Sequence, residues 1–264
     1  MADILIGTSG WHYASWKGPF YPPGLRLKDR LTFYATQFRT AELNGVFYRT
    51  PSIETVKAWR EQTPEGFVFA WKASKFITHW KRLSDHAQNS LDLLEERVSL
   101  LGDKAGPILF QLPPQFGINY ERLASFIRML RTNRQYAFEF RHPSWYVPRV
   151  LGLLSDKNIA LCLSDHADAP SPWRPTADFV YIRGHGPDGQ YKGRYSQATL
   201  QAWSQKIKNW RARGRDVFAY FDNDQKSAAP LDAERLMALS RATAPACNAK
   251  NATRDPRRVR NIGQ

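Results

Sequence analysis

The sequence is poor in cysteine and lacks a long hydrophobic run. Its only cysteines, Cys162 and Cys247, form neither a disulfide framework nor a metal-binding pair with the usual spacing. No stretch of about 18 apolar residues is present, which excludes a membrane-spanning helix. Residues 1–10 also lack the charged and apolar regions of a signal peptide. These absences predict a protein of the reducing cytoplasm with no disulfide partner and no membrane partner.

Negative charge is also scarce. The 264 residues include 38 Lys and Arg but 24 Asp and Glu, so the net charge is +14. Such an excess favours polyanionic partners, including nucleic acid and phosphorylated ligands. Part of it is local, because residues 245–264 hold one acidic residue and five basic ones: Lys250, Arg254, Arg257, Arg258 and Arg260. Residues 244–264 show no apolar period, and we expect them to form a disordered basic tail.

A Gly-x-Gly-x-x-Gly motif is missing after the first apolar run, which argues against an open dinucleotide-binding sheet. What is present is a series of short runs rich in β-branched and aromatic residues. They are Ile4–Ser9, Thr40–Phe47, Phe67–Ser74, Pro107–Leu112, Tyr136–Arg141, Ile159–Asp165, Phe179–Gly184 and Val217–Asn223. Stretches with helical spacing separate them, such as the apolar stripe Leu27, Leu31, Tyr34 and Phe38.

Strand and helix alternate about eight times, which predicts a single α/β domain of the (β/α)₈ TIM-barrel type over residues 1–243. One connection is irregular. Between the sixth and seventh strands, the segment "HADAPSPWRPTAD" contains Pro170, Pro172 and Pro175, which disfavour a helix. We expect this segment to be a loop, one able to close over the top of the barrel.

Polar residues stand at the end of every predicted strand, and in a barrel all these ends point to the face that carries active sites. The candidate catalytic residues are Glu42, Glu139, Asp165 and His185. The candidate ligand-binding residues are Ser9, Trp11, His12, Asn44, Tyr48, Lys72, Gln111, Arg141, Arg183 and Asn223. The alternation of side chains places Glu42 with Asn44, Glu139 with Arg141, and Arg183 with His185, either toward the axis or toward the helices. The alternative to a ligand pocket is an internal salt-bridge network.

Several chemistries fit these residues. A ring of Lys72, Arg141, Arg183 and His185 would bind a phosphate, with the loop "RGHGPDG" supplying backbone donors. Aromatic residues at the first two strand ends could stack on bases or sugars. Glu42 and Glu139 could serve as a glycosidase pair. Histidines and carboxylates at several strand ends could assist a metal-dependent hydrolase or isomerase, although no close-spaced metal motif occurs and we assign no metal ligands. A non-catalytic binding protein is also compatible. No cofactor is indicated.

The blocks "IGTSGWHYASWKGPFYP", "FQLPPQF", "FEFRHPSW", "DFVYIRGHG" and "FDND" occur in order along the chain. With the segment from Ala41 to His79, they resemble the YecE-like proteins of the DUF72 family. The resemblance covers about Ile4 to Leu239 and implies a TIM-barrel-like fold but no chemistry, since the family has no assigned activity. Two places differ from the pattern expected of that family. Gly45 and Val46 stand where serine and threonine are usual, and Asp222 stands where asparagine is usual.

Overall fold

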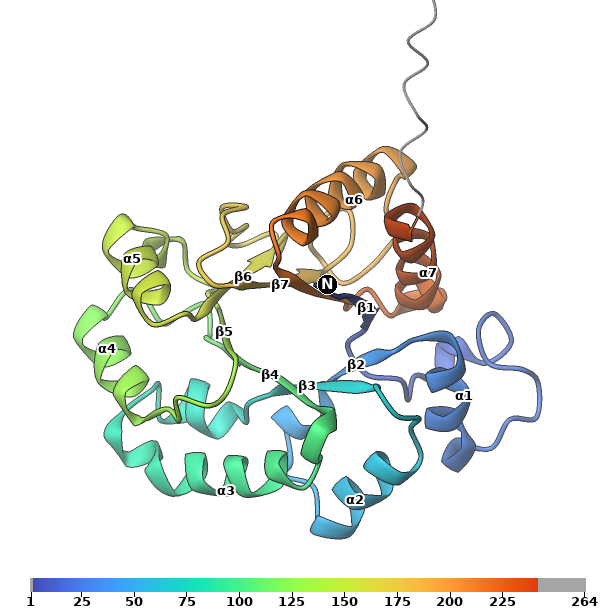
Figure 1. The fold of residues 1–264 in the computed structure, drawn as a ribbon, viewed down its shortest axis with the longest axis horizontal. Helices are drawn as coiled ribbons and strands as arrows, with labels where there is room; N and C mark the ends of the chain where they lie inside the picture. Colours follow the sequence, from blue (N-terminus) through green and yellow to red (C-terminus); the bar gives the residue numbers. More distant parts are fainter. Residues whose placement is uncertain (1, 242–264) are drawn as a thin grey trace, which may run out of the picture.

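Eight parallel strands form a barrel in the computed structural model, which describes residues 2–241 (Figure 1). The strands are β1 (Ile4–Thr8), β2 (Thr40–Leu43), β3 (Val68–Lys72), β4 (Ala105–Gln111), β5 (Tyr136–Glu139), β6 (Ala160–Ser164), β7 (Phe179–Gly184) and β8 (Asp216–Phe221). Each pairs with the next in the chain from β2 to β8, and β8 also pairs with β1. The predicted TIM-barrel-like α/β fold is therefore confirmed.

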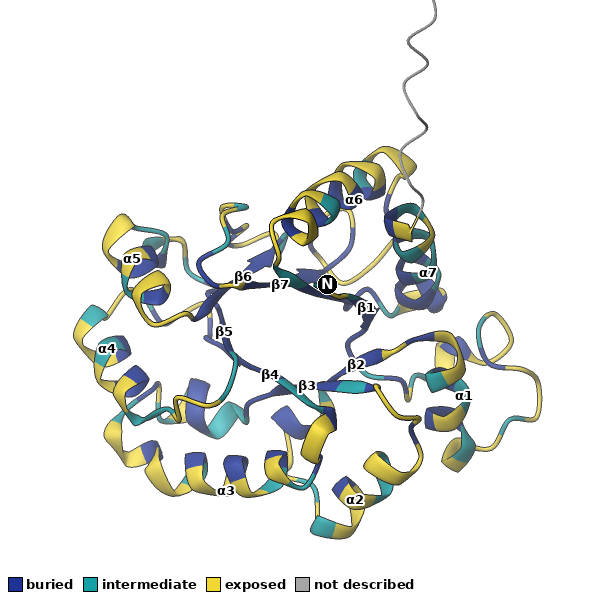
Figure 2. Ribbon diagram, in the orientation of Figure 1, coloured by how far each residue is buried: buried dark blue, intermediate teal, exposed yellow. Residues whose placement is uncertain are grey.

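Seven α-helices surround the barrel, with their exposed faces turned outward and the strands buried (Figure 2). They are α1 (Arg30–Gln37), α2 (Ile53–Glu61), α3 (Gln88–Ser99), α4 (Tyr120–Met129), α5 (Pro148–Asp156), α6 (Gln197–Ala212) and α7 (Ala228–Arg241). Short helical segments precede several of them, including η3 (Gly45–Phe47), the π-helical η4 (Phe76–Trp80) and η8 (Gln225–Ser227). The predicted tail 244–264 lies outside the described residues.

The seam between β1 and β2 closes the barrel through few backbone contacts. Ser9 and Glu42 form an isolated parallel bridge, and the Gly10 N–H donates to the Glu42 carbonyl at 2.8 Å. Below this bridge the Tyr34 hydroxyl is inserted between the strands. It accepts from the Thr8 N–H at 2.9 Å and donates to the Thr40 carbonyl at 3.0 Å. A Cβ at Gly7 would lie 2.2 Å from the Thr40 carbonyl oxygen, so glycine is needed there.

Two apolar cores result from the alternation of side chains along the strands. The outer core fills the space between strands and helices and includes Phe110, Phe138 and Trp145. The inner core lies within the barrel and is made by residues such as Leu5, Leu109, Phe179 and Tyr220. Cys162 belongs to this inner core, where it is a free, fully buried thiol.

The connection from β6 to β7 is a loop without a helix, as the prolines predicted. Its first residues lie at the mouth of the barrel, where the His166 ring packs edge-on against His185 and the Ala167 N–H donates to the Gly189 carbonyl at 3.2 Å. Its later residues run beside β6. Thr176 donates to the Ile159 carbonyl and accepts from the Leu161 N–H, both at 2.7 Å. Trp173 stacks on Trp210 of α6 with 12° between the ring planes.

One residue of the predicted helical stripes is also misplaced. Leu27 is 65% exposed because α1 begins only at Arg30, whereas Leu31, Tyr34 and Phe38 are buried as predicted. Gly102 and Gly214 have φ of +60° and +78°, the left-handed conformation expected where a helix ends.

Replacing Tyr34 with Phe removes the hydroxyl that joins β1 to β2 and leaves the Thr8 N–H and the Thr40 carbonyl without it. We expect the free energy of unfolding to fall by about 2 kcal/mol, the cost of buried unpaired backbone groups. Urea denaturation measures this. Tyr120→Phe is the control, because the Tyr120 hydroxyl has no hydrogen-bond partner among residues 2–241. An equal loss in the two variants would contradict this role of Tyr34.

Candidate ligand site at the mouth of the barrel

The alternation that builds the inner core also brings polar side chains to the carboxyl end of the barrel. On β7, Phe179 and Tyr181 belong to the inner core, and Arg183 and His185 continue the same row. On β8, Tyr220 is followed in that row by Asp222. On β5, Ala137 is followed by Glu139. The polar pairs whose direction the sequence left open therefore face the barrel axis.

Arg183 is the centre of this polar layer. Its guanidinium binds Glu42 at 2.8 Å, Glu139 at 2.8 Å and Asp222 at 2.7 Å. Arg183, Glu42 and Glu139 are fully buried. Tyr181 donates to the remaining oxygen of Glu42 at 2.6 Å, and Ser9 also binds this carboxylate. Since a buried arginine requires this degree of pairing, the arrangement matches the salt-bridge network considered above.

Arg141 and His185 extend the network. Arg141 Nε donates to Glu139 at 2.5 Å, and its other nitrogens reach the Tyr191 hydroxyl at 2.6 Å and His185 Nε2 at 3.0 Å. Because a guanidinium only donates, Nε2 must accept, and the proton of His185 lies on Nδ1, which faces Asp165 at 3.3 Å. Burial lowers the pKa of His185 well below its usual value, in agreement with a neutral ring.

Asp165 lies at the edge of this layer and is held by neighbouring loops. Its carboxylate accepts from the His185 N–H at 2.7 Å and from the Tyr195 hydroxyl. Burial raises the pKa of Asp165 to about 6. Burial also opposes ionisation of Glu139, but Arg141 and Arg183 hold the Glu139 pKa well below its usual value. Glu139 is thus an ionised, paired group with no exposed surface.

An open cavity of about 530 Å³ lies beside this network, between the loops that follow β1 and β2. We call it the aromatic cleft. Its walls include five aromatic or imidazole rings, two polar side chains and one arginine. The lining residues used below are Trp11, His12, Tyr13, Asn44, Gly45, Tyr48, Arg49, Trp59 and Asp224. No atom lies within 4 Å of the position where a Cβ of Gly45 would be, so the missing side chain leaves the cleft wider.

Two buried polar atoms from residues that line this cleft lack a hydrogen-bond partner among the described residues: Trp11 Nε1 and Asp224 Oδ1. Buried polar groups are normally paired, and an unpaired one costs about 1–3 kcal/mol. Burial and the neighbouring carboxylate of Asp222 raise the pKa of Asp224 to about 8. This shift favours the neutral form of Asp224 at neutral pH, whereas Asp222 is paired with Arg183.

A group of basic residues borders the cleft on the side of β3, and we call it the cationic rim: Lys72, Lys75, His79 and Arg82. Lys72 Nζ donates to Asn44 of the cleft at 3.1 Å, and Lys75 Nζ lies 5.5 Å from the ring centre of Tyr48. Burial, and then the charges of Lys72, Arg141, Lys75 and Arg82, lower the pKa of His79 to about 4. Burial, and then Arg183, lower the pKa of Lys72 to about 8.

Strained backbone is concentrated on the same face of the barrel. Non-glycine residues with positive φ are uncommon and often occur at functional sites. Five of the six in the described chain lie in loops that follow β3, β7 and β8, and the sixth, Asn158, precedes β6. The five are Arg82, Leu83, Tyr191, Lys226 and Ser227.

The residues predicted from sequence separate into two groups. Trp11, His12, Asn44 and Tyr48 line the cleft. The buried network or its edge contains Ser9, Glu42, Lys72, Glu139, Arg141, Asp165, Arg183 and His185. Gln111 is buried at the end of β4 and donates to the Leu112 carbonyl at 3.4 Å.

Asn223 does not join either group. Its amide donates to Asp232 of α7 at 3.0 Å and to the Gly193 carbonyl at 2.7 Å, so it faces outward from the barrel. Side chains alternate along β8, so after the inward-facing Tyr220 it is Asp222 that points into the barrel and Asn223 that points out of it. The sequence had also pointed to Tyr13 as a residue of the pocket wall and to Asp222 and Asp224 as polar residues at the end of the last strand, whereas it gave no indication of Tyr191 and Tyr195. Alternation on β8 distinguishes Asp222 from Asn223, whereas Tyr191 and Tyr195 lie in a long loop where no periodicity marks them.

Among residues 2–241, no three His, Cys, Asp or Glu side chains are grouped so that they could hold a metal ion.

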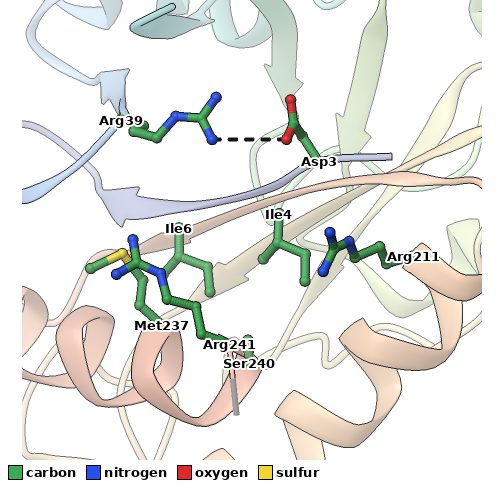
Figure 3. Close-up of a pocket in the computed structure, with 8 residues that line it drawn as sticks. All are labelled: Asp3, Ile4, Ile6, Arg39, Arg211, Met237, Ser240 and Arg241. Carbon is green, nitrogen blue, oxygen red and sulfur yellow. Dashed lines mark ion pairs between the residues drawn. The ribbon is translucent and has the colours of Figure 1, made fainter. Parts of the chain in front are cut away.

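A cavity of about 170 Å³ lies at the opposite end of the barrel, between the start of β1 and α7 (Figure 3). It is lined by Asp3, Ile4, Arg211 and Ser240, among others, and Asp3 pairs with Arg39 at 3.8 Å. In the part of the chain that is described, no helix is long and apolar enough to cross a membrane.

The fold and the site define a TIM-barrel-like protein with a buried ion network at the carboxyl ends of its strands and an aromatic cleft beside it. The sequence profile of the family described as "Protein of unknown function DUF72" matches residues 5–257. The chain belongs to this family, and the resemblance seen in its sequence blocks is confirmed.

Curated relatives and a solved structure agree with this assignment. The chain is 26% identical over 269 residues to UPF0759 protein YunF of Bacillus subtilis, covering 89% of this chain and 94% of that protein. It is 32% identical over 145 residues to UPF0759 protein YecE of Escherichia coli, covering 54% of this chain and 50% of that protein. The crystal structure of a DUF72 family protein from Thermotoga maritima is similar, with a TM-score of 0.80 and 25% identity, and covers 90% of this chain and 98% of that one.

Replacing Arg183 with Met leaves three buried carboxylates without their shared cation. We expect this substitution to reduce the free energy of unfolding by about 3–5 kcal/mol, measured by urea denaturation. The double variant Arg183→Met/Glu42→Gln removes one of the stranded charges and should recover part of the loss. A double variant that is no more stable than Arg183→Met would contradict a direct coupling of Arg183 to Glu42.

Proposed function

We propose that the protein binds an organic phosphate, with the phosphate group at the cationic rim and the rest of the molecule in the aromatic cleft. The observation that carries the proposal is the basic charge of the rim, whose cations make no direct ion pair among the described residues. Within residues 2–241, no ion pair joins Lys72, Lys75 or Arg82 to a carboxylate, whereas Arg141 and Arg183 are both paired. An anion bound among the three would relieve their mutual repulsion.

The position of this phosphate differs from the one expected from the sequence. The loop after β7 has little to offer an anion, because the backbone N–H groups of Gly186 and Gly189 are occupied. Gly186 N–H donates to the Tyr195 hydroxyl at 2.8 Å, and Gly189 N–H donates to the Gly186 carbonyl at 2.8 Å. Arg183 and His185 are fully buried in the network. Lys72 is the one member of the expected ring that also belongs to the rim.

The rim and the cleft are continuous, which supports a single ligand that occupies both. Asn44 and Tyr48 line the cleft, and they are the residues that contact Lys72 and Lys75. A compound with a ring and a phosphate matches this combination of aromatic walls and adjacent cations. Proteins of this fold place their ligands at this end of the barrel.

Isothermal titration calorimetry tests the proposal with glucose 6-phosphate, ribose 5-phosphate, AMP and inorganic phosphate, and with glucose and ribose as uncharged controls. Lys75→Ala should weaken the binding of the phosphates about tenfold, the typical effect of removing one charged contact. Lys157→Ala is the matched control, since Lys157 is exposed at the end of α5, on the opposite face of the barrel. Phosphates that bind no better than their uncharged parents would contradict the proposal. Salt-sensitive binding of a single-stranded oligonucleotide in place of the small phosphates would favour nucleic acid instead.

The affinity for a phosphate should also depend on pH through Lys72. Its pKa of about 8 means that Lys72 is charged below pH 8 and neutral above it. A phosphate monoester is already a dianion above roughly pH 7, so affinity should fall as pH rises from about 7.5 to 9.5. In Lys72→Met this fall should disappear. The same fall in wild type and variant would show that Lys72 does not contribute.

A further inference from the structure

We infer that the cleft recognises the hydroxyl groups of a sugar through Trp11 Nε1 and Asp224 Oδ1, so that the organic phosphate is a sugar phosphate. This inference rests on the proposed function and adds the substrate class. The two atoms are the unpartnered buried polar atoms contributed by the walls of this cleft, and they come from opposite ends of the chain. Sugar hydroxyls both donate and accept hydrogen bonds and can therefore satisfy each of them.

Trp11 is held rigidly while its N–H lacks an acceptor. The indole is 4% exposed and packs edge-on against Trp59, with ring centres 5.8 Å apart and planes at 87°. It also contacts Phe69 and Tyr34 on the side of the barrel core. A buried indole N–H normally finds a partner. A ligand oxygen in the cleft would supply the acceptor that no described residue provides.

The residues around Asp224 also favour a hydrogen bond between its carboxyl group and a ligand. The Tyr13 hydroxyl donates to the Ser9 carbonyl at 2.5 Å and also lies beside the Asp224 carboxyl. Asp222 lies near and is committed to Arg183 at 2.7 Å. A protonated Asp224 fits these surroundings, because it adds no charge beside Asp222 and its Oδ1, which has no partner among the described residues, is left for a ligand. A neutral carboxylic acid can exchange hydrogen bonds with a hydroxyl without repelling a nearby phosphate.

The geometry of the rings favours a sugar over a nucleobase. A flat base is bound best between or upon parallel aromatic faces. In this cleft the Trp11 plane meets the Trp59 plane at 87° and the His12 plane at 53°. A puckered sugar ring can instead pack its C–H groups against aromatic side chains that are inclined to one another. The wider space left by Gly45 adds room for its substituents.

Two substitutions test this inference by calorimetry. Trp11→Phe removes the N–H and keeps an aromatic ring, and it should weaken glucose 6-phosphate or ribose 5-phosphate binding about fivefold to tenfold while leaving inorganic phosphate unchanged. Trp173→Phe, on the outer wall of the barrel, is the control and should change neither. Asp224→Ala should weaken the sugar phosphates similarly, and Asp224→Asn should restore most of the affinity, because an amide also donates and accepts.

The outcomes separate the inference from the proposed function. If Trp11→Phe and Asp224→Ala bind sugar phosphates as the wild type does, the inference is overturned even though Lys75→Ala still weakens phosphate binding. If AMP binds more tightly than ribose 5-phosphate and its affinity does not change in Trp11→Phe, the protein recognises the base of a nucleotide. This result would also overturn the inference. If the uncharged sugars bind and respond to Trp11→Phe but Lys75→Ala has no effect on any ligand, the recognition of hydroxyls stands and the phosphate proposal fails.

Discussion

The ion cluster centred on Arg183 is the constraint on which the upper half of the barrel depends. Its guanidinium joins carboxylates from β2 and β5 and from the end of β8, so one side chain links strands that are distant around the sheet. A charged group with no exposed surface is tolerated only when every partner is in place. The cluster therefore fixes the positions from which the loops of the mouth begin.

This constraint explains why the cleft lies to one side of the barrel axis. The axis itself is filled, first by the inner apolar core and then by paired charges. A cavity large enough for a ligand lies where the loops after β1 and β2 diverge, beside the weakly closed seam. Lys72 and Lys75, which form no ion pair within residues 2–241, lie at the border of that space. The buried ion network thus stabilises the mouth of the barrel, and the adjacent cleft is open to solvent.

The fold was largely predictable because its signal is repeated. Eight short apolar runs separated by helical stripes leave few architectures other than a barrel, and an error in one unit, such as Leu27, does not change the count. The site was predictable only as a location. Alternation put Glu139 with Arg141 and Arg183 with His185, but the choice between an open pocket and a salt-bridge network depends on distances across the barrel.

The amino-acid sequence alone was enough to predict the order of strands and helices, the family membership and the set of polar residues that reach one end of the barrel. Local periodicity and turn residues encode these features, so each can be recognised within a short window. The three-dimensional structure was needed to show which charged residues pair and that Asn223 faces α7. It was also needed to show that Trp11 and Asp224 have unpaired atoms beside the same cleft. These properties arise from contacts between residues as far apart as β1 and the loop after β8, and pairing in space has no counterpart in a linear pattern.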